Sequence, residues 1–271
     1  RKAFQSTATL SRWACADRLD RVKKLKYVDE RPDLYNLDAT PYESLMLGLF
    51  TIHAKVLDGP RPKINYVTLG YSRDGFHWHR PDRRPFLDVS EDSKAWNYGN
   101  VQSVGGGCLI MGDKLYFYCS GRNSKKKRDD GSGGSTGLAI LRRDGFASMS
   151  ADAKGGELTT RPIRFTGKHL FVNVDCPRGS LHVEISDQNG KPIAPFTFAN
   201  SMSVSKDSTK TEVHWKGAKD LSALTNKTVR FRFRLKNGKL YSFWVGKDSR
   251  GASRGYVAAG GPGFTSNRDG E

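Results

Sequence analysis

The residue best placed to do chemistry is Glu43, a carboxylate near the start of the mostly apolar run 41–53. A second strand-like run covers residues 64–71, and a third strand is expected to start at 76–78. A carboxylate at the head of a buried strand lies at the end of a sheet, where a cleft can expose it. Such a side chain can act as a general acid or base. Glu43 is therefore the catalytic candidate.

The elements around Glu43 form a layout that occurs twice. Residues 108–120 predict a hairpin that turns at Gly-Asp, and the motif Ser-Arg-Asp-Gly-Phe at 72–76 returns as Arg-Arg-Asp-Gly-Phe at 142–146. Two such four-stranded units are typical of β-propeller blades. Asp74 and Asp144 are interpreted as turn residues, because an Asp side chain bonds its own backbone before a Gly.

The composition changes near residue 155, where alternating strands predict an antiparallel β-sandwich. No helix of any length is predicted, so the fold class is all-β: a partial propeller, with about half the blades, followed by the sandwich. The expected domains are residues 1–153, 154–246 and a Gly-rich tail, 247–271, which is either laid over the surface or partly disordered. The sandwich strands are expected at 170–174, 180–185, 212–215, 229–235 and 240–245, with hairpin turns at 188–191 and 236–239.

The charge balance admits two kinds of partner. The 271 residues carry a net charge of +17, which suits either nucleic acid or an acidic polysaccharide. The dense basic block 125–128 is interpreted as a solvated loop, and no nucleic-acid-binding motif accompanies it, so no nucleic acid is expected. The arginines at 230, 232 and 234 are expected to form one solvated face, with a polyanion site as the alternative.

Other classes of protein find little support. No apolar stretch approaches the roughly 18–20 residues that span a bilayer, so no membrane span is expected. The four cysteines form no CxxC motif and no His cluster has metal-ligand spacing, so neither a cofactor nor a metal is expected. Cys108 and Cys119 flank the predicted hairpin turn, where a disulfide and two buried thiols both remain open.

Several motifs together carry a resemblance to a known family. They resemble bacterial predicted glycosidases with a five-bladed β-propeller and a C-terminal β-sandwich, distantly similar to glycoside hydrolase families 32 and 43. The resemblance covers residues 1–265. The segments that carry it are 42–43, 72–78, 96–103, 112–118, 137–148, 158–162 and 240–244.

The resemblance implies a funnel-shaped site on the propeller axis with three carboxylates. Glu43 matches the general acid of the third blade, which protonates the leaving oxygen of a glycosidic bond. The two other carboxylates have no counterpart here, and Asp38 is the nearest spare one. The chain therefore resembles an N-terminally truncated glycosidase, which implies a secreted or periplasmic protein that hydrolyses a poly- or oligosaccharide.

Further candidates are side chains that can stack on sugar rings or bond their hydroxyl groups. A non-catalytic carbohydrate-binding or structural fragment is the alternative function, and an anionic glycan would suit the charge in either case. Each candidate also has a structural interpretation, as core or ion-pair partner, and the histidines at 77, 79, 169, 182 and 214 are interpreted as surface or strand residues. The substrate-binding candidates are Asp38, Tyr42, His53, Trp96, Asn97, Asn100, Gln102 and Arg122.

Overall fold

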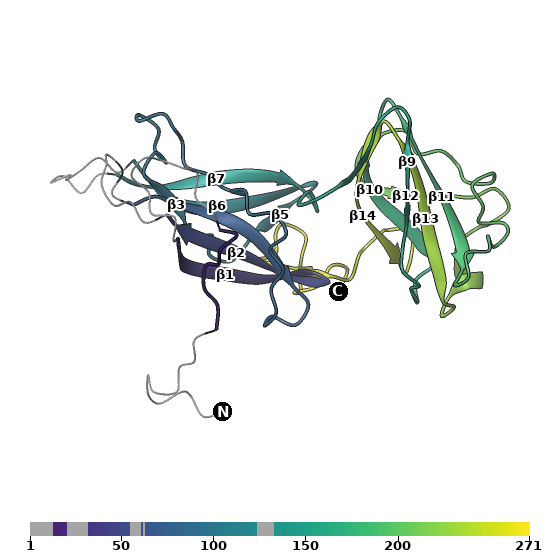
Figure 1. Ribbon diagram of the computed structural model, residues 1–271. Helices are drawn as coiled ribbons and strands as arrows, with labels where there is room; N and C mark the ends of the chain where they lie inside the picture. Colours follow the sequence, from purple (N-terminus) through teal and green to yellow (C-terminus); the bar gives the residue numbers. More distant parts are fainter. Residues whose placement is uncertain (1–12, 21–31, 55–60, 62, 124–132) are drawn as a thin grey trace. The chain divides into compact units, whose positions relative to one another are not determined.

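The computed structural model describes residues 13–20, 32–54, 61, 63–123 and 133–271. In these residues nearly all the regular secondary structure is β-strand, with one 3₁₀ turn, η2 (Ser222–Leu224), and no helix long and apolar enough to cross a membrane. The predicted all-β class is confirmed (Figure 1). The strands are β1 (Asp33–Glu43), β2 (Leu45–His53), β3 (Asn65–Ser72), β4 (Asn100–Gln102), β5 (Leu109–Met111), β6 (Lys114–Arg122), β7 (Gly134–Arg142), β8 (Met149–Ala151), β9 (Gly156–Thr159), β10 (His169–Asp175), β11 (Ser180–Asp187), β12 (Asp207–Glu212), β13 (Val229–Lys236), β14 (Gly238–Gly246) and β15 (Tyr256–Val257).

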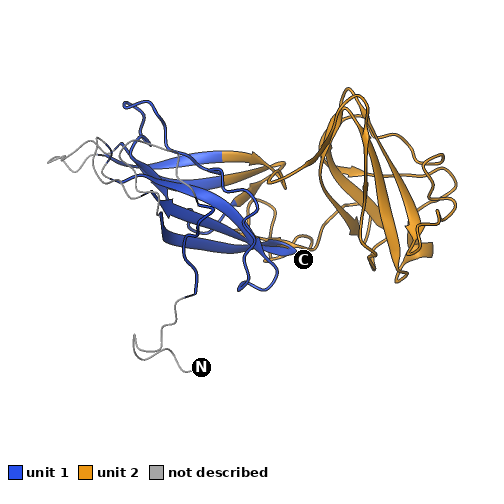
Figure 2. Ribbon diagram, in the orientation of Figure 1, with its two compact units in different colours: residues 1–108, 117–139 blue, residues 109–116, 140–271 orange. Residues whose placement is uncertain are grey.

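The chain divides into two compact units (Figure 2). The first unit contains Arg1–Cys108 and Phe117–Ala139, and the second contains Leu109–Tyr116 and Ile140–Glu271. The predicted domain boundaries, at 153/154 and 246/247, stay predictions.

In the first unit, β1, β2 and β3 form an antiparallel sheet in that order. The prediction that 41–53 is a single strand is wrong at its start. Tyr42 pairs with Leu45, so Glu43 and Ser44 form a two-residue hairpin turn between β1 and β2. Glu43 adopts a left-handed backbone with a φ of 50°, as this kind of tight hairpin turn requires. The apolar run was read correctly as β-structure, but the turn inside it lacks the Gly that usually marks one.

Strands β4, β5 and β7 all pair with β6, whose first residues are grouped with the second unit. β4 pairs with the end of β6, and β7 also pairs with β6. The predicted hairpin at 108–120 is confirmed as β5 and β6, with Gly112 at a φ of 63° in its turn. Cys119 is a buried thiol whose Sγ lies 3.8 Å from the Gly137 carbonyl oxygen, so the disulfide alternative is not formed.

The loop after β3 is ordered by one carboxylate. Asp74 Oδ1 accepts hydrogen bonds from the backbone N–H groups of Phe76, at 2.9 Å, and His77, at 2.8 Å. This confirms the interpretation of Asp74 as a turn residue. The expected third strand at 76–78 is wrong, because these bonds hold the segment in bends, and the Phe76 side chain is 61% exposed.

An ion-pair cluster holds the N-terminal segment 13–20 on the same unit. The Asp20 side chain is fully buried and accepts hydrogen bonds from the guanidinium groups of Arg80 and Arg83. Arg80 also donates to Thr68 Oγ1 at 2.9 Å, which ties the cluster to β3. A buried carboxylate needs this kind of compensation, since burial alone would disfavour its charge.

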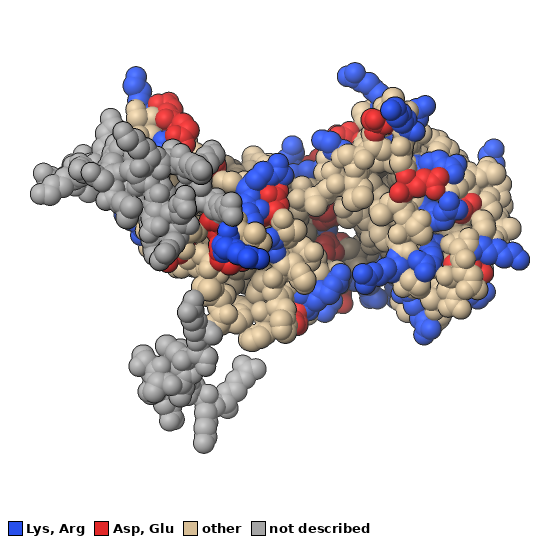
Figure 3. All heavy atoms as spheres, viewed as in Figure 1, with Lys and Arg blue, Asp and Glu red and all other residues tan. Residues whose placement is uncertain are grey.

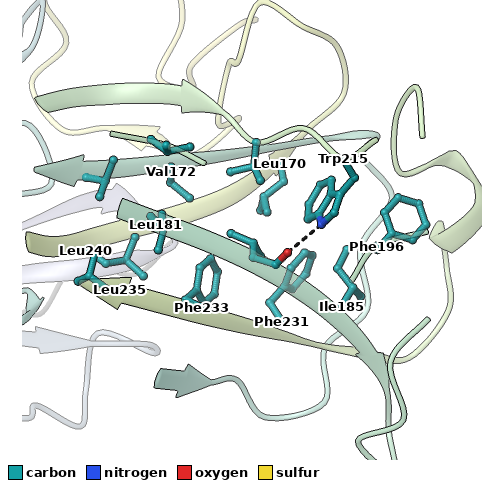
Figure 4. Packing of buried hydrophobic residues seen from close by; sticks show 14 of the residues in the cluster. Leu170, Val172, Leu181, Ile185, Phe196, Trp215, Phe231, Phe233, Leu235 and Leu240 are labelled. Atoms are coloured by element: carbon teal, nitrogen blue, oxygen red, sulfur yellow. Dashed lines mark hydrogen bonds between the residues drawn. The ribbon is translucent and has the colours of Figure 1, made fainter. Parts of the chain in front are cut away.

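The second unit contains a β-sandwich of two antiparallel sheets, ordered β12-β10-β14-β8 and β11-β13-β9. Alternating apolar residues of both sheets fill the core, in which Phe231 and Phe233 are almost completely buried. Figure 4 shows Trp215 among them, with its Nε1–H donating to the Val183 carbonyl oxygen at 2.8 Å. This bond satisfies the only polar group of the indole, as burial requires.

Three details of the sandwich differ from expectation. The turn at 236–239 is not a hairpin turn, because β13 and β14 belong to different sheets and the turn carries the chain between them. The strand expected at 212–215 ends at Glu212. The arginine face is paired instead of merely solvated: Arg232 contacts Glu184 at 2.6 Å and Glu157 at 2.9 Å, and Arg234 shares Glu157.

The tail 247–271 is described throughout. It contains β15, and the Ile110 backbone N–H donates to the Gly260 carbonyl oxygen at 2.8 Å. The basic block 125–128 lies outside the described residues. On the face seen in Figure 3, the Lys and Arg side chains of the second unit are spread among acidic ones and form no single basic patch.

Candidate functional site

Five of the nine residues predicted for the site lie at neighbouring strand positions in the first unit. Asp38 lies in β1 and His53 ends β2, while Asn100 and Gln102 belong to β4 and Arg122 ends β6. The register pairs Asn100 with Arg122, and hydrogen bonds connect β3 to Gln102 and β1 to Val104, just after β4.

A chain of side-chain hydrogen bonds crosses from β2 through β3 to β4. His53 Nδ1 lies 2.8 Å from Asn65 Oδ1, and Asn65 Nδ2 donates to Gln102 Oε1 at 2.6 Å. Asn65 is fully buried, whereas His53 and Gln102 are half-buried. With the Asn65 amide in this orientation, its oxygen accepts the proton of His53 Nδ1. The neutral imidazole then carries its lone pair on Nε2.

A bulge in β1 presents an aromatic ring beside this chain. The register of β1 against β2 shifts between Leu34 and Asn36, so Tyr35 is the extra residue. A bulge re-aims the side chain that it carries, and Tyr35 is 46% exposed. Lys63 Nζ lies 3.9 Å from the centre of the Tyr35 ring.

The electrostatic setting of Tyr35 is cationic. A hydrogen bond with Lys63 lowers the pKa of Tyr35 most, and the Lys63 charge, a hydrogen bond with Gln102 and the charge of Arg122 lower it further. These effects all favour the phenolate, because each places a donor or a positive charge near the oxygen. We call Tyr35, His53, Lys63, Asn65, Gln102 and Arg122 the amide cluster.

Asp38 and Asn100 lie on strands that neighbour the amide cluster. Asp38 Oδ2 accepts hydrogen bonds from the Val104 backbone N–H, at 2.7 Å, and from Asn36 Nδ2, at 2.9 Å. The carboxylate therefore holds Val104, in the segment just after β4, against β1. Asn100 is 4% exposed, and its Oδ1 has no hydrogen-bond partner among the described residues.

Glu43 and Tyr42 lie at the other end of the sheet. Glu43 is five residues beyond Asp38 along β1, which is roughly 16 Å at the rise of a strand. Tyr42 is buried, with 4% exposure, so its ring belongs to the interior. The structure does not bring Glu43 into the amide cluster.

Trp96 and Asn97 lie on a loop away from the cluster. The Trp96 ring occupies the space that side chains at Gly121 and Gly137 would need. Since neighbouring strand residues point to opposite faces, Gly121 and Arg122 place Trp96 and the amide cluster on opposite faces of the β4-β6-β7 sheet. Asn97 Nδ2 donates to the Asp88 carbonyl oxygen at 3.1 Å.

Sequence reasoning missed three members of the amide cluster. Tyr35 lies near the start of β1 and Lys63 just before β3, and the bulge presents the Tyr35 ring that lies beside Lys63. The sequence does contain a feature that could have identified Asn65, because it is a polar residue near the start of the strand-like run 64–71. A polar side chain in such a strand needs a partner.

No family model matches the chain, and the search of curated proteins also gives no match. Among solved structures, the chain is similar to a glycoside hydrolase family 43 arabinoxylan arabinofuranohydrolase from Bacillus subtilis in complex with cellotetraose. The sequence identity is 9% and the TM-score 0.24, and the similarity covers 79% of this chain. The chain spans 54% of that protein, about half its length, and a likeness this weak carries no statement about function.

Proposed function

We propose that the first unit binds a carbohydrate chain at the amide cluster. The observation that carries the proposal is the hydrogen-bonded chain from His53 through Asn65 to Gln102, beside the exposed ring of Tyr35. Amide, imidazole and guanidinium groups bond sugar hydroxyls, and an aromatic ring stacks on the apolar face of a sugar. The buried amide of Asn65 pre-organises its neighbours, so little ordering entropy is lost on binding.

The sequence motifs supply independent support for a carbohydrate ligand. Residues 72–78, 96–103 and 137–148 resemble those of propeller glycosidases. On the same grounds, we interpret the sheets of the first unit as blades of a partial propeller and the protein as a bacterial one, secreted or periplasmic.

Hydrolysis of a glycosidic bond is the second candidate function, with Glu43 as the acid. What favours it is the resemblance of segment 42–43 to the general-acid position of propeller glycosidases. Hydrolysis requires a second carboxylate about 5–9.5 Å from the first. The substitution Glu43→Gln should abolish release of reducing sugar and leave the fold intact, and unchanged release would remove Glu43 from the mechanism.

Calorimetric titration of the whole chain with a panel of oligosaccharides tests the binding proposal. Tyr35→Ala and Gln102→Ala should each weaken binding by about tenfold or more, or about 1.4 kcal/mol. Phe76→Ala is the matched control, because Phe76 is an exposed ring in the loop after β3 and outside the cluster. Equal affinities for all four proteins would contradict the proposal.

A further inference from the structure

We propose that the amide cluster catalyses β-elimination in a glycan that contains uronic acids. The proposal rests on glycan binding at this cluster. In the reaction a base removes the proton at C5 of the uronate, and the electron pair of that C–H bond forms a C4=C5 double bond. The C4–O bond breaks, and the leaving oxygen takes a proton from an acid. The reaction is balanced and consumes no water, oxidant or reductant.

The base that the reaction needs is present in His53. Because Asn65 Nδ2 donates to Gln102, the Asn65 oxygen is left to accept the His53 Nδ1 proton. The lone pair of the neutral imidazole is then on Nε2, the nitrogen at the far side of the ring. A general base must have this form before it meets its proton. Asn65 acts as a positioning residue for His53.

The acid is Tyr35. Its bulge position and its 46% exposure make the phenol accessible to a bound chain. Lys63 and Gln102 both interact with the phenol, and the lowered pKa of Tyr35 makes it a stronger proton donor than an ordinary tyrosine. After transfer, the same two groups stabilise the phenolate that remains.

The cations of the cluster suit the uronate carboxylate. Removal of the C5 proton builds negative charge next to that carboxylate, so nearby positive charge lowers the barrier. Lys63 and the exposed Arg122 supply it. Two acidic groups are also near: Asp33 pairs with His53 in the strand register, and Asp38 accepts two hydrogen bonds from Val104 and Asn36.

Elimination fits this cluster better than hydrolysis does. Hydrolysis uses two carboxyl groups, one of them as an acid. Asp38 already accepts hydrogen bonds from Val104 and Asn36, and Glu43 lies at the far end of β1. Elimination needs no catalytic carboxylate, only a base, an acid and a cation, and the cluster has all three.

The test incubates the whole chain with polygalacturonate, alginate and chondroitin sulfate, and with neutral xylan as the comparison. Three quantities are measured: ultraviolet absorbance of the double bond conjugated to the carboxylate, reducing ends, and binding by calorimetry. We expect absorbance and reducing ends to rise together with one uronate polymer. Xylan should give neither signal.

Variants assign the roles. Tyr35→Phe keeps the ring and should lower kcat by about a hundredfold or more with little change in KM, the loss typical of a missing proton donor. His53→Gln should lower kcat to a similar extent, because it removes the base. Phe76→Ala should retain full activity. If Tyr35→Phe and His53→Gln both eliminate at the wild-type rate, the assignment is wrong.

The outcomes separate this inference from the binding proposal. If a uronate polymer binds but the ultraviolet absorbance of the double bond does not rise, elimination is overturned and carbohydrate binding stays in place. The same holds if reducing ends form without that absorbance. Binding only to neutral glycans would do the same. If no glycan binds at all, both proposals fail.

Discussion

Asn65 Nδ2 lies 2.6 Å from Gln102 Oε1, and this hydrogen bond joins the buried start of β3 to β4. The same Asn65 side chain bonds His53 through its oxygen. One buried amide therefore fixes two half-exposed side chains from two other strands. The proposed functions depend on this relationship, because a preformed pair loses less entropy on binding than two mobile side chains.

Asn65→Ala should destabilise the first unit by about 1–3 kcal/mol, since it removes a fully buried amide and takes a hydrogen-bond partner from the half-buried side chains of His53 and Gln102. Urea unfolding followed by fluorescence measures the change. Asn189→Ala is the control, because Asn189 is exposed in a turn of the sandwich and should be within about 0.5 kcal/mol of the wild type. An Asn65 variant as stable as the control would refute the structural role of the amide.

Asp20→Ala should cost about 3–5 kcal/mol, because it leaves the guanidinium groups of Arg80 and Arg83 without their buried counter-charge. The exposed pair between Asp82 and Arg84 provides the control, and Asp82→Ala should have an effect of at most about 1 kcal/mol. Thermal unfolding of both variants gives the comparison. Equal transition temperatures would show that segment 13–20 is not held by Asp20.

Alkaline pH should destabilise the protein through Tyr66. Burial, with a smaller contribution from Asp20, raises the pKa of Tyr66 from 10.0 to about 12. In the unfolded chain Tyr66 ionises at the lower value, so stability is complete below pH 10 and is lost as the pH rises toward 12. The loss is about 2–3 kcal/mol by the usual conversion. Tyr66→Phe should flatten this part of the stability profile, and a profile identical to the wild type would contradict the assignment.

Gly121→Ala should destabilise the first unit by about 1–3 kcal/mol, because the new methyl group would overlap the Trp96 ring. Gly105→Ala is the matched control, since a Cβ there meets open space. Tryptophan fluorescence would report displacement of Trp96 in the first variant only. An unshifted spectrum and full stability would show that the ring is not seated on Gly121.

Particular residues show how far the sequence could predict this molecule. The alternation of apolar and polar residues, together with turn residues, was sufficient to predict β3, β11 and the hairpin of β5 and β6. These elements depend on local sequence patterns. The hairpin turn at Glu43 was missed, since neither Glu nor Ser marks a turn by itself. The site was only half predicted: His53 and Gln102 were chosen for their chemistry, but the bulge at Tyr35 arises from pairing between strands.

The most direct measurement of the central claim is a titration of the isotope-labelled protein with glycan, followed by NMR of the side-chain amide groups. Binding at the amide cluster predicts that the Gln102 and Asn65 amide signals shift progressively as glycan is added, while the signal of the exposed Asn189 in the sandwich stays in place. Shifts confined to Asn189 and other residues of the sandwich, with Gln102 and Asn65 unchanged, would contradict the account and move the binding site to the second unit.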